Sequence, residues 1–198
     1  MFFVIGILSG ILSVLMYFPY ARDILKGTTR PERASWLIWS VLGLIAVASQ
    51  AAKGATDSLW MTVAQTAGTI CIFGFSLKYG YGGLIKRDIV ALIAAGFGLV
   101  LWFLTKDALY ALMLVIIIDG IGAALTVVKA YEQPESETVI TWILGATSAV
   151  LGTIAVGRID PILMSYPFYV FLANVSVLTG IYVGFKRKRR KKNYSKSQ

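Results

Sequence analysis

The sequence has no histidine, only one cysteine and few charged residues. Among its 198 residues, 15% are Asp, Glu, Lys or Arg, and the single cysteine is Cys71. Histidine is the usual general base and the commonest metal ligand, and its charge changes near neutral pH. A lone cysteine cannot form an intrachain disulfide. These absences argue against a Ser-His-Asp enzyme and against a zinc centre, so we expect no enzyme, no metal site and no cofactor.

Apolar residues make up most of the chain. Hydrophobic residues account for 57% of the sequence, against about 45–50% in soluble domains. Seven apolar runs, each near the length of about 20 residues that a helix needs to cross a bilayer, lie at 2–20, 34–52, 59–78, 89–105, 108–130, 138–157 and 161–185. The runs are continuously apolar rather than alternating, which favours helices over a β-barrel. We therefore expect an all-α integral membrane protein with seven transmembrane helices.

Basic residues are distributed unequally over the joints between these runs. The joints after the second, fourth and sixth runs hold three basic residues, Lys53, Lys106 and Arg158, whereas the other side of the membrane carries sixteen. An excess of Lys and Arg marks the cytoplasmic side. The sequence predicts an N-terminus outside and a C-terminus in the cytoplasm, in the cytoplasmic membrane of a prokaryote.

The C-terminal tail, residues 186–198, carries eight of these basic residues. Its composition is also typical of a nucleic-acid patch. Because it directly follows the last apolar run, we favour a role in fixing topology and contacting anionic lipid heads. We expect no nucleic-acid partner.

A short motif, P-E-x-x-[ST]-x-x-x-W, occurs twice. It runs from Pro31 to Trp39 and, without a gap, from Pro134 to Trp142. Proline cannot continue a preceding helix, and the hydroxyl residue of each copy, Ser35 or Thr138, lies where it could cap the next helix. Capping alone could explain either copy, but it does not explain why the motif recurs.

Both copies precede the second helix of a set of three, which suggests a duplication. The expected organisation is a first triple-helix repeat at 1–80, a linker helix at 81–106, a second repeat at 107–185 and the tail at 186–198. An odd linker helix makes the two triplets parallel. Parallel repeats of this kind build a site between the halves and work by alternating access.

Asp119 is the only acid deep inside a run. A carboxylate at that depth costs a few kcal/mol on insertion scales, so it should face the bundle interior or a wet cavity. Its helical neighbours at three, four and seven residues are Gly122, Ala123 and Thr126. This small, polar face predicts that Asp119 and Thr126 line a solute path. A structural acid bonded to neighbouring hydroxyls is the alternative.

Two amides and two tryptophans complete the predicted path. Gln65 and Asn174 stand at equivalent depths in the two triplets, where they could bind a solute or serve as interhelical hydrogen bonds. Trp39 and Trp142 lie a turn or two inside the cytoplasmic boundary, which favours interfacial anchors or an inner gate over platforms for a sugar ring.

Four residues are candidate hinge or helix-packing positions: Pro19, Gly122, Pro31 and Pro134. In the first repeat, Phe18-Pro19-Tyr20 is similar to the Pro-Gln pair of the SWEET and PQ-loop superfamily. In the second, Asp119-x-x-Gly122-Ala123-x-x-Thr126 is similar to the Asp-x-x-Gly-Gly-x-x-Ser stretch of lysosomal PQ-loop transporters. Leu125 or Thr126 stands where a second proline would be expected.

The resemblance to the SWEET and PQ-loop superfamily implies seven helices in a 3+1+3 arrangement with the N-terminus outside. It also implies that Asp119 couples protons and that Gln65 and Asn174 stand at the substrate-contacting positions of sugar facilitators. We therefore expect a transporter of a small polar solute, a sugar or an amino acid, that works by alternating access with Asp119 as the proton carrier if transport is coupled. The alternative is a non-transporting receptor or scaffold on the same fold, which predicts a filled core around Asp119.

Overall fold

The computed structural model describes residues 1–81, 89–90, 93, 96–97, 100, 103–104 and 108–196. These residues form a helical bundle without β-strands, as the apolar runs predict. The helices are α1 (Phe2–Leu15), α2 (Tyr17–Leu25), α3 (Arg33–Ala52), α4 (Leu59–Tyr79), α6 (Ala108–Glu132), α7 (Val139–Ala155) and α8 (Pro161–Lys196), with a short 3-10 turn, η1 (Pro134–Ser136). The expected all-α class is confirmed for the described part of the chain.

Within that part, five helical segments are long and apolar enough to cross a membrane: Phe2–Leu25, Arg33–Ala52, Leu59–Tyr79, Met113–Glu132 and Pro161–Lys191. Helix α7 is apolar but has only 17 residues, about 26 Å at 1.5 Å per residue, a little short of a hydrocarbon core of about 30 Å. The expected fourth span, 89–105, and the linker, 81–106, fall mostly outside the described residues. The five long helices fit a multi-pass membrane protein.

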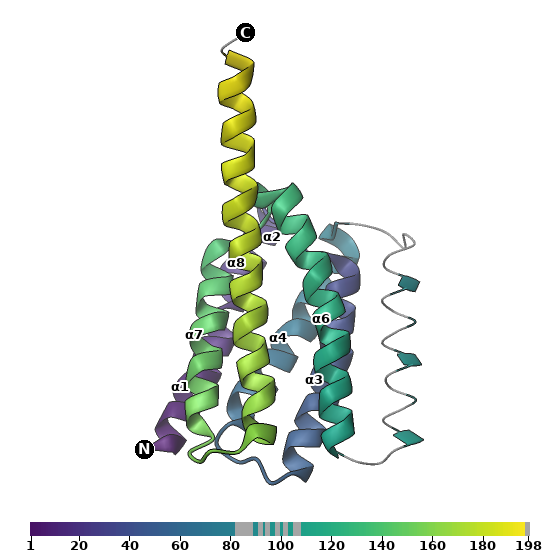
Figure 1. Cartoon of the computed structure of the whole chain (residues 1–198), viewed down its shortest axis with the longest axis vertical. Helices are drawn as coiled ribbons and strands as arrows, with labels where there is room; N and C mark the ends of the chain where they lie inside the picture. The colour runs from purple at the N-terminus through teal and green to yellow at the C-terminus, as the bar shows by residue number, and fades with distance from the viewer. Residues whose placement is uncertain are drawn as a thin grey trace.

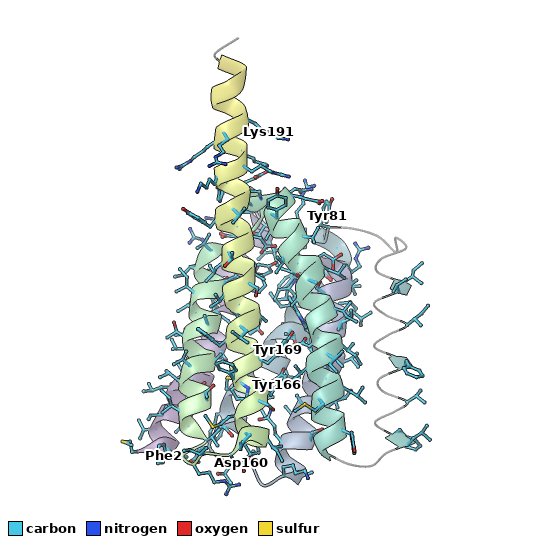
Figure 2. All side chains as sticks on the ribbon, in the orientation of Figure 1. Phe2, Tyr81, Asp160, Tyr166, Tyr169 and Lys191 are labelled. Carbon is cyan, nitrogen blue, oxygen red and sulfur yellow. The ribbon has the colours of Figure 1, made fainter. Side chains whose placement is uncertain are left out.

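The six apolar segments of the described chain pack in a closed ring. Helix α1 contacts α4 and α7, α3 contacts α4 and α6, and α8 contacts α6 and α7 (Figure 1). Phe2 and Asp160 mark one end of the bundle, which we call the N-terminal end, and Tyr81 and Lys191 lie toward the other, the tail end (Figure 2). The ring surrounds the candidate site described below.

Helix α8 extends well beyond the bundle at the tail end (Figure 1). Its 36 residues correspond to a length of about 54 Å, against a hydrocarbon core of about 30 Å. The predicted tail at 186–198 is therefore not a separate coil, because the helix continues to Lys196. All eight basic residues of the tail thus lie on the last turns of this helix.

The first span is interrupted near its middle. Helix α1 ends at Leu15, and α2 begins at Tyr17 and continues to Leu25, beyond the end predicted at residue 20. Pro19 explains the break, because proline lacks the N–H that would bond the Leu15 carbonyl and its ring clashes with that group. The equivalent helix of the second half, α6, is unbroken from Ala108 to Glu132 and has no proline.

The expected hydroxyl caps are wrong. Helix α3 is capped by the carboxylate of Glu32, which accepts a hydrogen bond of 2.8 Å from the backbone N–H of Ser35. Thr138 precedes α7, but its hydroxyl donates to Oδ2 of Asp23 at 3.0 Å instead of capping the helix. Both hydroxyls are bonded to partners that lie on other segments, since Ser35 Oγ also donates to the Gly122 carbonyl at 2.9 Å.

The two motif copies also differ in register at the helix start. Helix α3 begins two residues after Pro31, whereas Pro134 opens the 3-10 turn and α7 begins five residues later. Counted from the first helical residue, Trp142 therefore corresponds to Trp36 and not to Trp39. A superposition of the two motif copies without gaps cannot reveal this shift. In the second copy, the 3-10 turn occupies motif positions that belong to the helix in the first copy.

Asp160 caps the N-terminus of α8. Its Oδ1 accepts hydrogen bonds of 3.1 Å from the backbone N–H groups of Ile162 and Leu163, and its Oδ2 pairs with Arg158 at 3.1 Å. The Leu163 N–H, together with Arg158, holds the pKa of this carboxyl below its ordinary value.

The cap predicts a pH-dependent effect of Asp160→Ala. Because the pKa is lower in the folded chain, the stabilisation is complete above the unfolded value and is lost as the pH falls through the folded one. We expect the melting temperature of Asp160→Ala to lie below that of the wild type at pH 7 and to approach it at pH 2. Arg158→Gln should have the smaller effect at pH 7, since the ion pair is exposed. An equal deficit at both pH values would contradict the charged cap.

Candidate functional site

A cavity of about 50 Å³ lies inside the ring, near the middle of the bundle. All six apolar segments contribute to its wall, which is formed by Met16, Tyr17, Trp36, Trp39, Gly43, Gln65, Thr66, Thr69, Asp119, Ala123, Trp142, Tyr166, Val170, Ala173, Asn174 and Val177. A water molecule needs about 10–15 Å³ measured in this way. The space therefore holds a few waters, and a sugar or an amino acid needs the wall to move.

Five of the six residues predicted on the solute path line this cavity: Asp119, Gln65, Asn174, Trp39 and Trp142. The sixth, Thr126, is buried with its hydroxyl unpartnered among the described residues, but it does not line the cavity. The five predicted residues in the wall thus come from five different helices, α3, α4, α6, α7 and α8, and line the same cavity.

Asp119 is the only carboxylate in the cavity wall. It is 7% exposed, and no cation of the described residues pairs with it. The hydroxyl of Tyr169 lies next to it but makes no hydrogen bond of standard geometry. A carboxylate without a partner in the middle of a bundle is expensive to bury. Tyr169 is the hydroxyl that a structural acid at this position would use.

The two predicted amides are held differently. The Asn174 side chain donates from Nδ2 to the Val170 carbonyl at 2.8 Å, and its Oδ1 lies against Gly145 of α7. Gln65 leaves its Oε1 buried without a partner in the described chain, as Trp36 leaves its Nε1. Asn174 Oδ1 is likewise buried without a partner in the described chain, so Asn174, Gln65 and Trp36 each have an unpaired polar atom and each line the cavity.

Five aromatic residues form a layer between the cavity and the tail end: Tyr17, Tyr20, Trp36, Trp39 and Trp142. Trp36 is at the centre, with ring centroids 5.1 Å from Trp39, 5.2 Å from Tyr20 and 6.5 Å from Trp142. Trp36 and Trp142 are 2% and 4% exposed. Of the two predicted tryptophans, Trp142 is thus buried in the layer, whereas Trp39 is half-buried.

A buried ion pair lies at the tail end, near the aromatic layer. Lys129 of α6 and Glu137, both with fully buried side chains, pair at 2.7 Å. The Lys129 ammonium also donates to the carbonyls of Arg30 and Ser136, and Trp142 Nε1 donates to the other Glu137 oxygen at 3.0 Å. We call these residues the Lys129 cluster. It joins the segment before α3 to α6 and α7.

A buried apolar cluster lies between the cavity and the N-terminal end of the bundle. Met61 of α4, Val115 of α6 and Ile45 of α3 are 0%, 2% and 7% exposed and belong to one buried cluster. Two residues of the cavity wall, Tyr166 and Val170, also belong to this cluster.

None of the four candidate hinge or packing residues lines the cavity. Pro19 is at the break in the first span, Pro31 accepts a hydrogen bond from the Tyr81 N–H at 2.7 Å, and Pro134 begins η1. Gly122 has a packing role, because a Cβ there would lie 3.2 Å from Nε1 of Trp39.

Comparison with protein-family models, with curated proteins and with solved structures finds no match to this chain. The functional argument therefore depends on the geometry of the cavity and its surroundings.

Sequence reasoning missed several residues of the site. Tyr17 and Trp36 line the cavity. Their sequence signal is an aromatic side chain two residues before Pro19, for Tyr17, or about one turn before Trp39, for Trp36. The Lys129 cluster was also missed, because Lys129 counts as an ordinary loop cation when only topology is considered. In the part of the chain that the structure describes, no group of three His, Cys, Asp or Glu side chains could hold a metal ion.

The position of Tyr17 in the wall depends on Gly68 of α4. A Cβ at Gly68 would clash with the Tyr17 ring, whose hydroxyl donates to the Gln65 carbonyl at 2.9 Å. We expect Gly68→Ala to destabilise the fold by about 1–3 kcal/mol through overpacking. Gly74→Ala on the same helix is the matched control, since a Cβ there meets nothing within 4 Å and alanine favours the helix. Thermal unfolding in detergent measures both, and equal effects would contradict this account.

Proposed function

We propose that the protein is a membrane transporter of a small polar solute that works by alternating access. The observation that carries the proposal is the central cavity with Asp119 in its wall, buried and without a cation in the described chain. Gln65 and Trp36 add unpartnered polar atoms at the same cavity. Acids inside membrane bundles are typical of proton relays and substrate paths, so Asp119 is the proposed proton carrier if transport is coupled.

A duplicated 3+1+3 organisation is part of the proposal, and two hydrogen bonds support it. Ser35, the third residue of α3, donates to the Gly122 carbonyl of α6, and Thr141, the third residue of α7, donates to the Met16 carbonyl of the first span. Each bond joins the second helix of one triplet to the first helix of the other. The order of helices in the ring is consistent with the same two-fold relation. The contact of α1 with α4 corresponds to that of α6 with α8, and the contact of α3 with α4 to that of α7 with α8. The contact of α3 with α6 corresponds to that of α7 with α1.

The proposed orientation has the tail end in the cytoplasm. Cations of the described tail end include Arg22, Lys26 and the basic residues of α8 from Lys186 onward, whereas Lys53 and Arg158 lie at the N-terminal end. The predicted contributions of Lys86, Arg87 and Lys106 lie outside the described residues. A cytoplasmic excess of Lys and Arg is the usual arrangement.

In this proposal the structure corresponds to a closed conformation. The cavity of about 50 Å³ is too small for a sugar or an amino acid, so access requires the halves to move apart at one end. The aromatic layer and the Lys129 cluster would form the cytoplasmic gate, since they join the two halves. The apolar packing around Met61 would form the outer gate.

The similarity of short stretches to the SWEET and PQ-loop superfamily agrees with this proposal. The receptor or scaffold alternative predicts a filled core around Asp119, and the cavity favours transport over it. The two hypotheses also differ in ligand binding, because a transporter must bind its solute inside the bundle and a scaffold need not bind any.

A melting-temperature screen tests the proposal. Purified protein in detergent is heated with sugars, amino acids and vitamins at pH 5.5 and 7.5. A ligand that binds only the folded state stabilises it by about 2.7 kcal/mol at a hundred times its dissociation constant. We expect one solute class to raise the melting temperature of the wild type and to lose this effect in Gln65→Leu. The absence of a shift with any solute would favour the scaffold.

A further inference from the structure

A second concave surface lies on the outside of the bundle, between α6 and α8. It is a groove of about 440 Å³ lined by Val127, Val128, Tyr131, Val175, Ser176, Thr179, Gly180 and Val183. The Ser176 and Thr179 hydroxyls donate to the carbonyls of Leu172 and Val175, both at 2.8 Å. The polar atoms of these side chains are thus already satisfied within their own helix, and the groove offers an apolar surface to its surroundings.

Glycine creates this groove. At Gly180 a Cβ would lie 3.0 Å from the Val127 carbonyl, and at Gly184 it would lie 2.6 Å from the Tyr131 carbonyl. The two helices therefore touch through their backbones along the Gly180-x-x-x-Gly184 stretch. The missing side chain at Gly180 leaves a furrow between Val128 of one helix and Val183 of the other, which are 43% and 42% exposed.

A cation lies at the end of the groove nearest the tail. Arg187, one helical turn beyond Val183, stacks its guanidinium over the Tyr131 ring at 4.2 Å. It donates to the Tyr131 carbonyl at 3.4 Å, and its buried Nε has no partner among the described residues. The guanidinium is therefore fixed in position by the same tyrosine that lines the groove.

The surrounding charges favour an anion. Seven consecutive basic residues, 186–192, continue along α8, and two acids, Glu132 and Glu135, lie nearby at the end of α6 and in η1. Lys188 pairs with Glu135 at 2.6 Å, so these two charges neutralise each other. The local excess is positive where the apolar groove ends.

We infer that this groove binds one anionic phospholipid, with an acyl chain between α6 and α8 and the phosphate on Arg187. The groove has an apolar furrow that ends at a fixed guanidinium. A phospholipid has the same arrangement, because its apolar acyl chain is joined to a phosphate at the level of the headgroup region. Guanidinium groups bind phosphate oxygens through paired hydrogen bonds, and basic residues at helix ends recognise anionic headgroups. The site is independent of the solute cavity and does not depend on transport.

Native mass spectrometry of the full chain in detergent tests this inference with two probes, phosphatidylglycerol and phosphatidylcholine of equal chain length. We expect one phosphatidylglycerol to remain bound, and Arg187→Gln to weaken it about tenfold, the loss typical of a hydrogen bond to a charged group. Arg189→Gln is the matched control. It removes the same charge from the opposite face of α8 and should leave the affinity unchanged. Arg187→Lys keeps the charge and should retain part of the binding.

A second variant separates the groove from the charge. Gly180→Leu would fill the furrow while leaving every cation in place, and Val183→Trp would do so from the rim without affecting the Gly180 backbone contact. Either should release phosphatidylglycerol in a protein that melts cooperatively. Equal losses in Arg187→Gln and Arg189→Gln would mean diffuse attraction by the tail and would overturn the inference. So would equal retention of phosphatidylcholine, or displacement of the lipid by free glycerol phosphate at millimolar concentration.

Discussion

Asp119→Asn should abolish proton movement in liposomes that contain the protein. Asparagine keeps the size and the hydrogen-bonding shape of the side chain but cannot gain or lose a proton. Among the described residues, Asp119 is the only carboxylate in the wall of the cavity. With a pH-sensitive dye inside the liposomes and the solute found by the melting screen outside, we expect the proton signal to fall to that of protein-free liposomes.

Three controls make this result specific. The Asp119→Asn protein should melt at or above the wild-type temperature, because a buried charge without a partner has been removed. Asp57→Asn, in the loop between α3 and α4, and Thr126→Val, outside the cavity wall, should leave the proton signal unchanged. Solute exchange across the membrane without a pH gradient should persist in Asp119→Asn. Proton-linked uptake that survives in this variant would end the coupling hypothesis, whatever happens to exchange.

The sequence predicts the helices of this fold well and their packing partly. In the described part of the chain, continuous apolar runs predict the helices within a few residues, except where Pro19 interrupts the first one and where α8 continues into the tail. The fourth run, 89–105, lies mostly outside that part. Asp119 could be found because an acid is conspicuous in an apolar run. Gln65 and Asn174 could be found for the same reason, and the cavity includes all three.

Features that depend on contacts between distant segments could not be predicted. Lys129 and Glu137 are eight residues apart across a turn, and nothing local indicates that the two side chains are buried against each other. The shift that makes Trp36 the counterpart of Trp142 comes from the 3-10 turn at Pro134, which a short motif cannot reveal. Thr126 was expected in the path because it shares a helical face with Asp119, but it lies almost two turns away, beyond the wall of the cavity.

Glu137→Gln should be among the most destabilising single substitutions in the chain. It leaves the Lys129 ammonium, fully buried, with two carbonyls and no counter-charge. Removing one partner of a buried ion pair typically costs about 3–5 kcal/mol, because an uncompensated charge stays in the interior. Thermal unfolding in detergent, followed by tryptophan fluorescence, measures the loss. Trp142 is a suitable reporter, since its Nε1 donates to Glu137.

The exposed pair of the same region supplies the matched control. Lys188 and Glu135 pair at 2.6 Å, but both side chains are about half exposed. The hydrogen bond from Lys188 holds the pKa of Glu135 below its ordinary value, yet exposed pairs contribute only about 0–1 kcal/mol. Glu135→Gln should therefore have a small effect, although it removes the same chemical group two residues away.

A double variant separates the ion pair from the rest of the Lys129 cluster. Lys129→Met with Glu137→Leu removes both charges and keeps apolar volume in their place, which is often neutral for a buried pair. We expect it to recover most of the stability lost in Glu137→Gln, while the Arg30 and Ser136 carbonyls, which lose their donor, keep the recovery incomplete. If the double variant were less stable than Glu137→Gln, the stabilisation would come from the hydrogen bonds to these carbonyls, and the Lys129 cluster could hold the tail end closed without its counter-charge.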